Sequence, residues 1–156
     1  MPNKLTTPTL KHKFYTACQA YAKERSETAL KAIKSIQQAA NDDTKNTAGD
    51  KHETGRAMMH LEREKADMQL IEAEKLLQVM ERIDPEKTCK KVELGAIVTA
   101  SNGVFFLAIS MGKYELDGNR YWIISPNAPI AQAMLGKKAG EPFSFNGRRI
   151  RISSVL

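Results

Sequence analysis

Four carboxylates gather in one short stretch near the middle of the chain, at Asp42, Asp43, Asp50 and Glu53. Divalent cations such as Mg²⁺ prefer hard oxygen ligands, so two or three carboxylates can complete the shell of an ion that another molecule already holds in part. All four are therefore candidate catalytic residues, with Asp42 and Asp43 as the candidate metal ligands. From the residues alone a structural role is favoured, because Asp42 and Asp43 can end a helix while Asp50 and Glu53 favour the positive end of the next, and the two roles can coexist.

Other residue patterns that carry chemistry are absent from the sequence. It has no GxGxxG, no Walker-type loop, no GxSxG and no HExxH motif, which excludes the dinucleotide, nucleotide, serine-hydrolase and zincin classes. His52 and His60 are eight positions apart, about 12 Å along a helix, too far to share an ion. Cys18 and Cys89 lack CxxC spacing, so we expect neither a disulfide framework nor a zinc site, and a reducing compartment.

The charge of the 156-residue chain is unevenly distributed. The formal net charge is +6, and residues 85–156 hold 10 Lys and Arg against 5 Asp and Glu. This surplus indicates an acidic partner, either nucleic acid or an acidic protein surface. No apolar run is long enough to cross a bilayer and the N-terminus lacks a secretory signal, so we expect a cytoplasmic protein without a membrane partner.

The first half of the sequence predicts two long helices. From Thr9 to Ala40 there is no Gly or Pro, and a second periodic segment runs from Asp50 to Ile83 and stops before Pro85. Two such helices joined by a short loop must lie antiparallel, so residues 1–84 are expected to form a coiled-coil finger with its tip at 41–53. The expected seam residues are Phe14, Cys18, Tyr21, Ala29, Ala32, Ile36 and Ala39 of the first helix, and Met58, Leu61, Met68, Ile71, Val79 and Ile83 of the second.

Residues 85–156 predict a second, small α+β domain. Strands are expected at Leu94–Ala100, Gly103–Ser110, Arg120–Ser125 and Arg148–Val155, with a hairpin turn at Asn146-Gly147. A short helix is expected at Pro129–Leu135, ended by Gly136. The expected core residues are Val104, Phe105, Phe106, Trp122, Ile123, Ile124, Phe143, Phe145 and Ile150.

One C-terminal segment carries a family resemblance. The stretch Ile123-Ile124-Ser125-Pro126-Asn127-Ala128-Pro129-Ile130, continuing to Glu141, resembles the C-terminal signature of the bacterial transcript-cleavage factors of the GreA/GreB family. Ala128-Pro129-Ile130 takes the place of the family's Ser-Pro-Ile, and Gly136-Lys137 and Gly140-Glu141 follow at the expected spacing. The family architecture, a helical hairpin and then an FKBP-like α+β domain, matches the predicted elements along nearly the whole chain.

The resemblance implies a transcription elongation factor that is not an enzyme of its own. Such a factor binds RNA polymerase through its C-terminal domain and inserts the finger into the secondary channel, where tip carboxylates promote RNA cleavage by the polymerase. It would have no cofactor of its own and would share Mg²⁺ with the polymerase. The resemblance also implies DNA binding as a family property. The implied polymerase-binding residues are Pro129, Ile130, Gly136 and Lys137, and those implied to face nascent RNA are Lys23, Arg25, Lys31 and Lys34.

The tip departs from the family pattern. Family cleavage factors carry Asp-x-x-Glu-Asn, whereas Asp43-Thr44-Lys45-Asn46 lacks the Glu. A non-cleaving regulator that occupies the channel, or a coiled-coil adaptor without a catalytic role, therefore remains as an alternative. A prolyl isomerase would need an aromatic-lined pocket, and the few aromatic residues are expected in the core. We expect a monomer, because the hairpin packs on itself.

Overall fold

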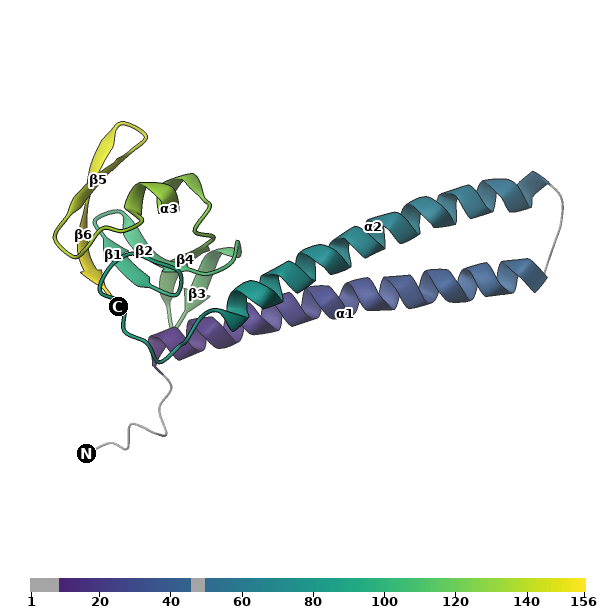
Figure 1. The fold of residues 1–156 in the computed structure, drawn as a ribbon, viewed down its shortest axis with the longest axis horizontal. Coiled ribbons are helices and arrows are strands. Elements are labelled where there is room, and N and C mark those ends of the chain that lie inside the picture. The colour runs from purple at the N-terminus through teal and green to yellow at the C-terminus, as the bar shows by residue number, and fades with distance from the viewer. Residues whose placement is uncertain (1–8, 46–49) are drawn as a thin grey trace, which may run out of the picture. The chain divides into compact units, whose positions relative to one another are not determined.

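A computed structural model describes residues 9–45 and 50–156 of the chain, with side chains described for 9–42 and 54–156. In these described residues, two long helices are followed by four strands, a short helix and two further strands, which is an α+β arrangement (Figure 1). The chain divides into two compact units. One is Ala20–Gln78, formed by the middle of both long helices. The other joins the segment up to Gln19 with Val79–Leu156 and contains the whole sheet.

The two long helices are α1, Leu10–Lys45, and α2, Asp50–Glu81. The expectation that the first helix ends near Ala40 is wrong, because α1 continues for five further residues, Asn41–Lys45. Each of these residues costs less than about 0.7 kcal/mol relative to Ala in a helix, and no Gly or Pro lies between Thr9 and Gly49. The Asn, Asp and Thr residues after Ala40 are therefore not unfavourable enough to end α1. The connecting residues 46–49 lie outside the described part of the chain.

The seam between the two helices is built from small residues. Ala22 and Ala29 of α1 and Ala66 and Ala73 of α2 are between 0% and 3% exposed. On α2 the buried and half-buried positions recur at alternating steps of four and three, the spacing of a coiled-coil seam. The positions with this spacing are Met59, Arg63, Ala66, Leu70, Ala73, Leu77 and Met80, and Gly55, Asp67, Leu76 and Val79 are half-buried beside them.

The sequence-based choice of seam residues is partly wrong. Met58, Leu61, Met68 and Ile71 of α2 are 51–68% exposed, and Ala39 of α1 is also exposed. Helix α2 therefore carries two apolar stripes, one with Leu61 and Met68 and one with Ala66 and Ala73. The second stripe faces α1, because small side chains allow the helix backbones to approach closely. The predicted Phe14, Cys18 and Ala29 of α1 and Ile83, just beyond α2, are buried, and Tyr21, Ala32, Ile36 and Val79 are half-buried.

The sheet has the strand order β3-β4-β2-β1-β6-β5. Strands β2 and β4 pair in parallel, and the other neighbours are antiparallel. Three two-residue turns connect neighbouring strands, at 101–102, 117–118 and 146–147. The strands are β1 Ile97–Ala100, β2 Gly103–Leu107, β3 Gly112–Leu116, β4 Asn119–Ile124, β5 Pro142–Phe145 and β6 Arg148–Val155.

Two strands were missed by the sequence analysis, β3 and β5, and two were predicted too long. Strand β1 begins at Ile97 rather than Leu94, and β2 ends at Leu107 rather than Ser110. The turn Asp117-Gly118 has φ values of 51° and 80°, and Asp-Gly is a characteristic sequence for such a hairpin. If Asp117-Gly118 had been identified as a hairpin turn, a strand before it, β3, would have been predicted to pair with β4. The turn at Asn146-Gly147, with φ of 50° at Asn146, was predicted and is present.

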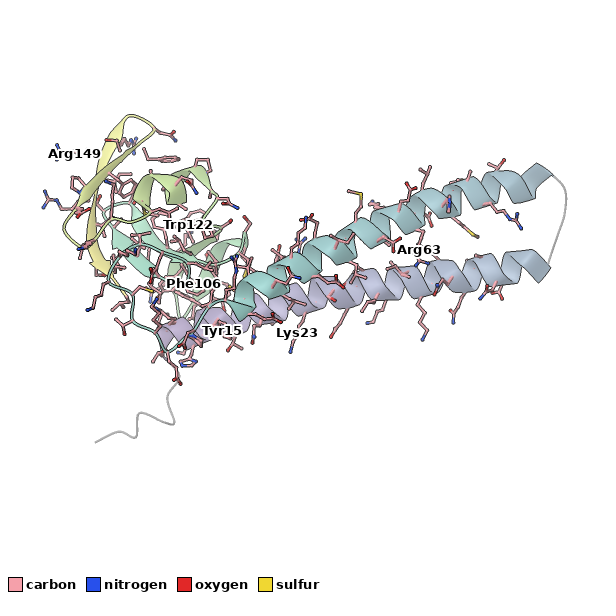
Figure 2. All side chains as sticks on the ribbon, viewed as in Figure 1. Tyr15, Lys23, Arg63, Phe106, Trp122 and Arg149 are labelled. Atoms are coloured by element: carbon pink, nitrogen blue, oxygen red, sulfur yellow. The ribbon has the colours of Figure 1, made fainter. Side chains whose placement is uncertain are left out.

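Both faces of the sheet are covered. On one face, the ring of Phe14 lies 5.4 Å from that of Phe106 and 4.8 Å from that of Tyr121, measured between centroids. On the other face, helix α3, Pro129–Met134, buries Ala131 and Met134 in the main core. Phe106 and Trp122 are labelled in Figure 2. The sheet unit therefore has a layer of side chains on each side.

The predicted core residues are mostly confirmed, with one clear exception. Trp122 is 38% exposed, so its placement in the core was wrong. Its indole lies beside Gly103, where a Cβ would come within 3.5 Å of the ring. A large side chain such as Trp is rarely enclosed completely. Val104, Ile124 and Phe145 are half-buried, and Phe105, Phe106, Ile123, Phe143 and Ile150 are buried.

Candidate functional site

The acidic residues occupy the two helix ends that flank residues 46–49. Asp42 and Asp43 lie in the last turns of α1, and Asp50 and Glu53 lie at the start of α2. Asp42 is exposed. The side chains of Asp43, Asp50 and Glu53 lie outside the described residues. Among the residues whose side chains are described, no group of three or more His, Cys, Asp or Glu could hold a metal ion.

A spacing at the start of α2 was missed by the sequence analysis. Asp50-Lys51-His52-Glu53 has the Asp-x-x-Glu spacing that was sought at Asp43 and not found there, and Thr54 follows it. Both carboxylates belong to the first turns of α2. Carboxylates near a helix N-terminus are favoured by the positive end of the helix dipole. Asp50 and Glu53 are therefore the best-spaced carboxylate pair of the acidic segment.

The four basic residues of α1 that were predicted to face RNA fall into two groups. Lys23, Lys31 and Lys34 are exposed and have spacings of eight and three, which place them on the side of the helix away from the seam. Arg25 is different, because its guanidinium carbon lies 4.6 Å from the centroid of the Tyr21 ring, at the side that faces α2. Three of the four residues therefore share one surface, and Arg25 belongs to another.

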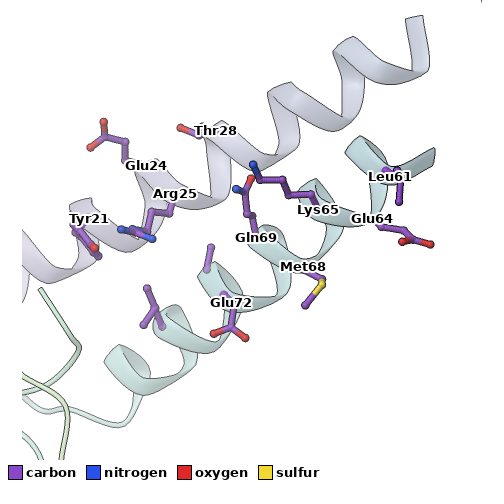
Figure 3. A pocket seen from close by; sticks show the side chains of 12 residues that line it. Tyr21, Glu24, Arg25, Thr28, Leu61, Glu64, Lys65, Met68, Gln69 and Glu72 are labelled. Atoms are coloured by element: carbon purple, nitrogen blue, oxygen red, sulfur yellow. The ribbon is translucent and has the colours of Figure 1, made fainter. Parts of the chain in front are cut away.

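A groove of about 830 Å³ runs between the two helices on the side of Arg25 (Figure 3). Its lining mixes apolar residues with charges of both signs. Leu61 and Met68 form its most exposed apolar part. The residues that line it are Tyr21, Glu24, Arg25 and Thr28 of α1, and Leu61, Glu64, Lys65, Met68, Gln69, Glu72, Ala73 and Leu76 of α2.

The segment that resembles the GreA/GreB signature has a clear structural role. Pro129 is the first residue of α3 and is exposed, while Ile130 is half-buried against the core. Gly136 has φ of 80°, which favours glycine, and its N–H donates to the carbonyl of Val92 at 2.9 Å. The Val92 N–H donates in return to the carbonyl of Lys137 at 2.8 Å. These backbone bonds hold the segment before β1 against the end of α3.

Lys11 is a buried cation that the sequence analysis did not single out. It is 7% exposed, and its Nζ donates to the carbonyls of Lys87 at 2.6 Å and Leu156 at 3.1 Å. It also lies 3.8 Å from Cys89 Sγ. Lys11 therefore joins the start of α1, the segment after α2 and the last residue of the chain. Lys11 lies one helical turn before Phe14 and so on the same face of α1, and this spacing could have predicted that Lys11 is buried.

The titratable groups around Lys11 are perturbed in ways that follow from their surroundings. Burial raises the pKa of the Cys89 thiol. Elsewhere in α1, away from the Lys11 contacts, burial alone raises the pKa of the Cys18 thiol to about 12. The hydrogen bond from Lys87 lowers the pKa of Glu93, and Glu93 in turn raises the pKa of Lys87. Both thiols are therefore held protonated at neutral pH, unlike a nucleophilic cysteine.

Comparison with known proteins gives no family assignment. No protein-family model matches the chain, and a search of curated proteins gives no significant match. In the described part of the chain, no helix combines the length and the apolar character needed to span a bilayer.

Proposed function

We propose that this protein is a transcription elongation factor of the GreA/GreB type, which binds RNA polymerase and inserts its helical hairpin into the secondary channel. One observation carries the proposal: a long antiparallel helix pair with an acidic segment at 41–53 is joined to a small sheet unit that contains the Ile123–Glu141 segment. In this proposal the sheet unit is FKBP-like and the protein acts in the cytoplasm as a monomer.

The dimensions of the hairpin support a role in reaching a distant centre. With 36 and 32 residues, α1 and α2 are each about 50 Å long. The seam of α2 uses Ala66 and Ala73, which keeps the two helices close together. A narrow helical pair with acidic residues at one end can carry carboxylates into a channel that a globular domain cannot enter.

The carboxylates fit a shared rather than a resident Mg²⁺ ion. Mg²⁺ demands six oxygen ligands in an octahedral shell, and Asp50 with Glu53 supplies only part of that number. The tip can therefore hold the ion only together with ligands of the polymerase. When bound, the ion supplies activation of a water and stabilisation of the leaving oxygen. The contribution of this chain is to bring Asp50 and Glu53 to that place, with Asp42 and Asp43 adding negative charge beside it.

The basic residues of α1 support contact with RNA at one surface. Lys23, Lys31 and Lys34 present three ammonium groups on the solvent side of α1, where a phosphate backbone can approach. We assign Arg25 a lesser part in RNA contact, because it stacks on Tyr21 beside the groove.

In this proposal the C-terminal segment docks on the polymerase. Pro129 is exposed at the start of α3 and Ile130 lies directly behind it. Gly136 and Lys137 contribute mainly by fixing the end of α3 through their bonds to Val92. A substitution at Pro129 should therefore weaken docking while the fold is kept.

A non-cleaving regulator is the second candidate, and one observation favours it. Thr54 follows Asp50-Lys51-His52-Glu53 where family cleavage factors have Asn. A Thr hydroxyl donates and accepts at a single oxygen, so it cannot place a donor and an acceptor on two separate atoms as an Asn amide does. In that case the protein would occupy the channel and change pausing without RNA cleavage.

Transcript shortening in a backtracked elongation complex tests both candidates. End-labelled RNA is followed with Mg²⁺ and the wild-type chain, Asp50→Asn/Glu53→Gln, Asp42→Asn/Asp43→Asn, and a control, Glu62→Gln/Glu74→Gln, whose residues are exposed on α2 away from its first turns. We expect loss of cleavage in the first variant and wild-type activity in the control. No cleavage by any chain, with competition against an authentic cleavage factor, would establish the non-cleaving regulator. A chain that neither cleaves nor competes would refute both candidates.

A further inference from the structure

The groove between α1 and α2 is a surface that the proposed function does not use. All of its lining residues belong to the unit Ala20–Gln78. On the α2 side, Leu61 and Met68 are 67% and 68% exposed, and their spacing of seven places them on one face of the helix. Large apolar side chains that are exposed together mark a contact with another protein. The groove is therefore a candidate docking surface.

Two opposite charges lie beside these apolar residues. Lys65 and Glu72 are both exposed on the α2 side of the groove (Figure 3). They are about 10 Å apart along the helix, too far to pair with each other. In the described part of the chain, Lys65 takes part in no ion pair, and Glu72 pairs with Lys75 of its own helix at 3.4 Å. Exposed pairs of this kind contribute little, so both charges are available to a partner.

The sequence of α2 is complementary to itself when it is reversed. We consider two antiparallel copies with a two-fold axis between Met68 and Gln69. Leu61 then comes level with Leu76 of the second copy, and no two like charges come level anywhere in residues 56–81. Opposite charges come level at four pairs of positions, Arg56 with Glu81, Glu62 with Lys75, Arg63 with Glu74, and Lys65 with Glu72. The last of these pairs lies in the groove itself.

We propose that the α1–α2 groove docks the same groove of a second copy of this chain, with the two α2 helices antiparallel. Two helical hairpins that pack in this way form a four-helix bundle. The interface covers Leu61 and Met68 of both copies, and its two-fold symmetry uses each contact twice. Charges of opposite sign beside an apolar seam select the partner and its orientation, and here the complementary sequence is that of α2 itself.

The inference goes beyond the proposed function and can fail independently of it. Self-association is a property of the free protein and is measured without polymerase, whereas the hairpin tip is tested with polymerase present. The proposed function takes the monomer as the acting form. A dimer through the groove is therefore the form that must dissociate before a hairpin of two helices enters a channel.

Sedimentation velocity of the full-length chain across a concentration series tests the inference. We expect a dimer that dissociates on dilution. Glu72→Lys should raise its dissociation constant about tenfold, because two attractive contacts per dimer become repulsive. Glu64→Lys is the control, since it makes the same change of charge in the groove at a position that is level with Ala73. The exchange Lys65→Glu/Glu72→Lys should restore the wild-type dissociation constant.

Crosslinking with a short bismaleimide tests the antiparallel arrangement. Met68 lies beside the proposed two-fold axis, so the Met68→Cys chain should form a crosslinked dimer. Met58 is 61% exposed but lies about 30 Å along the helix from its counterpart in the antiparallel pair, so the Met58→Cys chain should stay uncrosslinked. The native Cys18 and Cys89 are buried and should not react.

Four outcomes would overturn the inference. A chain that sediments as a monomer at every concentration does not self-associate. Equal dissociation constants for Glu72→Lys and Glu64→Lys, or no recovery in the charge exchange, would place the dimer contact elsewhere. Crosslinking of the Met58→Cys chain would show a parallel pair. Unchanged sedimentation of Glu72→Lys with weakened polymerase binding would assign the groove to the polymerase. Circular dichroism of each variant shows that the fold is kept, as expected for exposed side chains.

Discussion

The two compact units of the chain are stabilised in different ways. The unit Ala20–Gln78 packs through small residues such as Ala29 and Ala66, and leaves Leu61 and Met68 about two-thirds exposed. The sheet unit encloses large side chains, among them Phe106 and Met134, completely. Buried apolar area is the main source of stability, so the sheet unit is the stable part and the hairpin is the part with least packing. The hairpin that carries the proposed functional tip is therefore stabilised less than the sheet unit.

The largest expected effect is a cavity in the sheet unit. Phe14 is fully buried and contacts the rings of Phe106, Tyr114 and Tyr121. Phe14→Ala should lower the free energy of unfolding by about 3–5 kcal/mol, because it removes both transfer free energy and packing. Urea unfolding followed by tryptophan fluorescence measures it. A loss below about 1 kcal/mol would contradict the assignment of stability to this unit.

The next effect is backbone strain at a glycine with a close neighbour. Gly95 has φ of 89°, and a Cβ there would lie 3.2 Å from Cγ2 of Ile83. Gly147 also has a positive φ, 74°, but a Cβ there meets nothing within 4 Å. Gly95→Ala should therefore cost more than Gly147→Ala, for which the backbone term of about 1–2 kcal/mol stands alone. Equal urea midpoints for the two variants would show that the contact with Ile83 relaxes freely.

A pH-dependent effect follows from the buried thiol of Cys18. Its pKa is raised to about 12, so the folded state keeps its proton above pH 9 while the unfolded state loses it. Its contribution to stability is complete below about pH 9 and is lost as the pH rises toward 12, at about 1.4 kcal/mol per pH unit. Urea unfolding at pH 8 and pH 10, with Cys18→Ala as the control, should show a steeper loss in the wild-type chain. Identical losses would contradict this origin.

A smaller effect is expected in the hairpin seam. Ala66→Gly should destabilise α2 by about 1 kcal/mol through helix propensity, with little effect on the sheet unit. Hydrogen exchange resolves the two units, and faster exchange should appear in Ala20–Gln78 only. Faster exchange of equal size in β1 and β2 would show that the two units unfold together and do not differ in stability.

The sequence predicted the elements better than it predicted their contacts. The hairpin, α3 and the Asn146-Gly147 turn follow from local signals, namely helical period, proline at a helix start and turn residues. Local signals do not show which of the two apolar stripes on α2 faces α1, because Leu61 and Met68 are more hydrophobic than Ala66 and Ala73. Close approach of two helices rewards small residues, and only the structure shows which face approaches.

Of the candidate site, the sequence located the acidic segment but could not decide among its carboxylates. Asp50 and Glu53 were already expected at the start of the second helix, but their Asp-x-x-Glu spacing, which the sequence shows, was not recognised. Lys11 was missed because its partners, Lys87, Cys89 and Leu156, are brought to it by tertiary structure alone.

The central claim is that the hairpin tip reaches the polymerase active centre, and hydroxyl-radical cleavage of this protein from that centre tests it most directly. In a backtracked complex, Fe²⁺ replaces the Mg²⁺ of the polymerase and generates hydroxyl radicals at the active centre. The fragments of the end-labelled protein are then mapped. Our account predicts cuts confined to residues 41–53, which disappear when excess Mg²⁺ displaces the iron. Cuts within the sheet unit instead, or an uncut chain that still binds the polymerase, would contradict insertion of the hairpin.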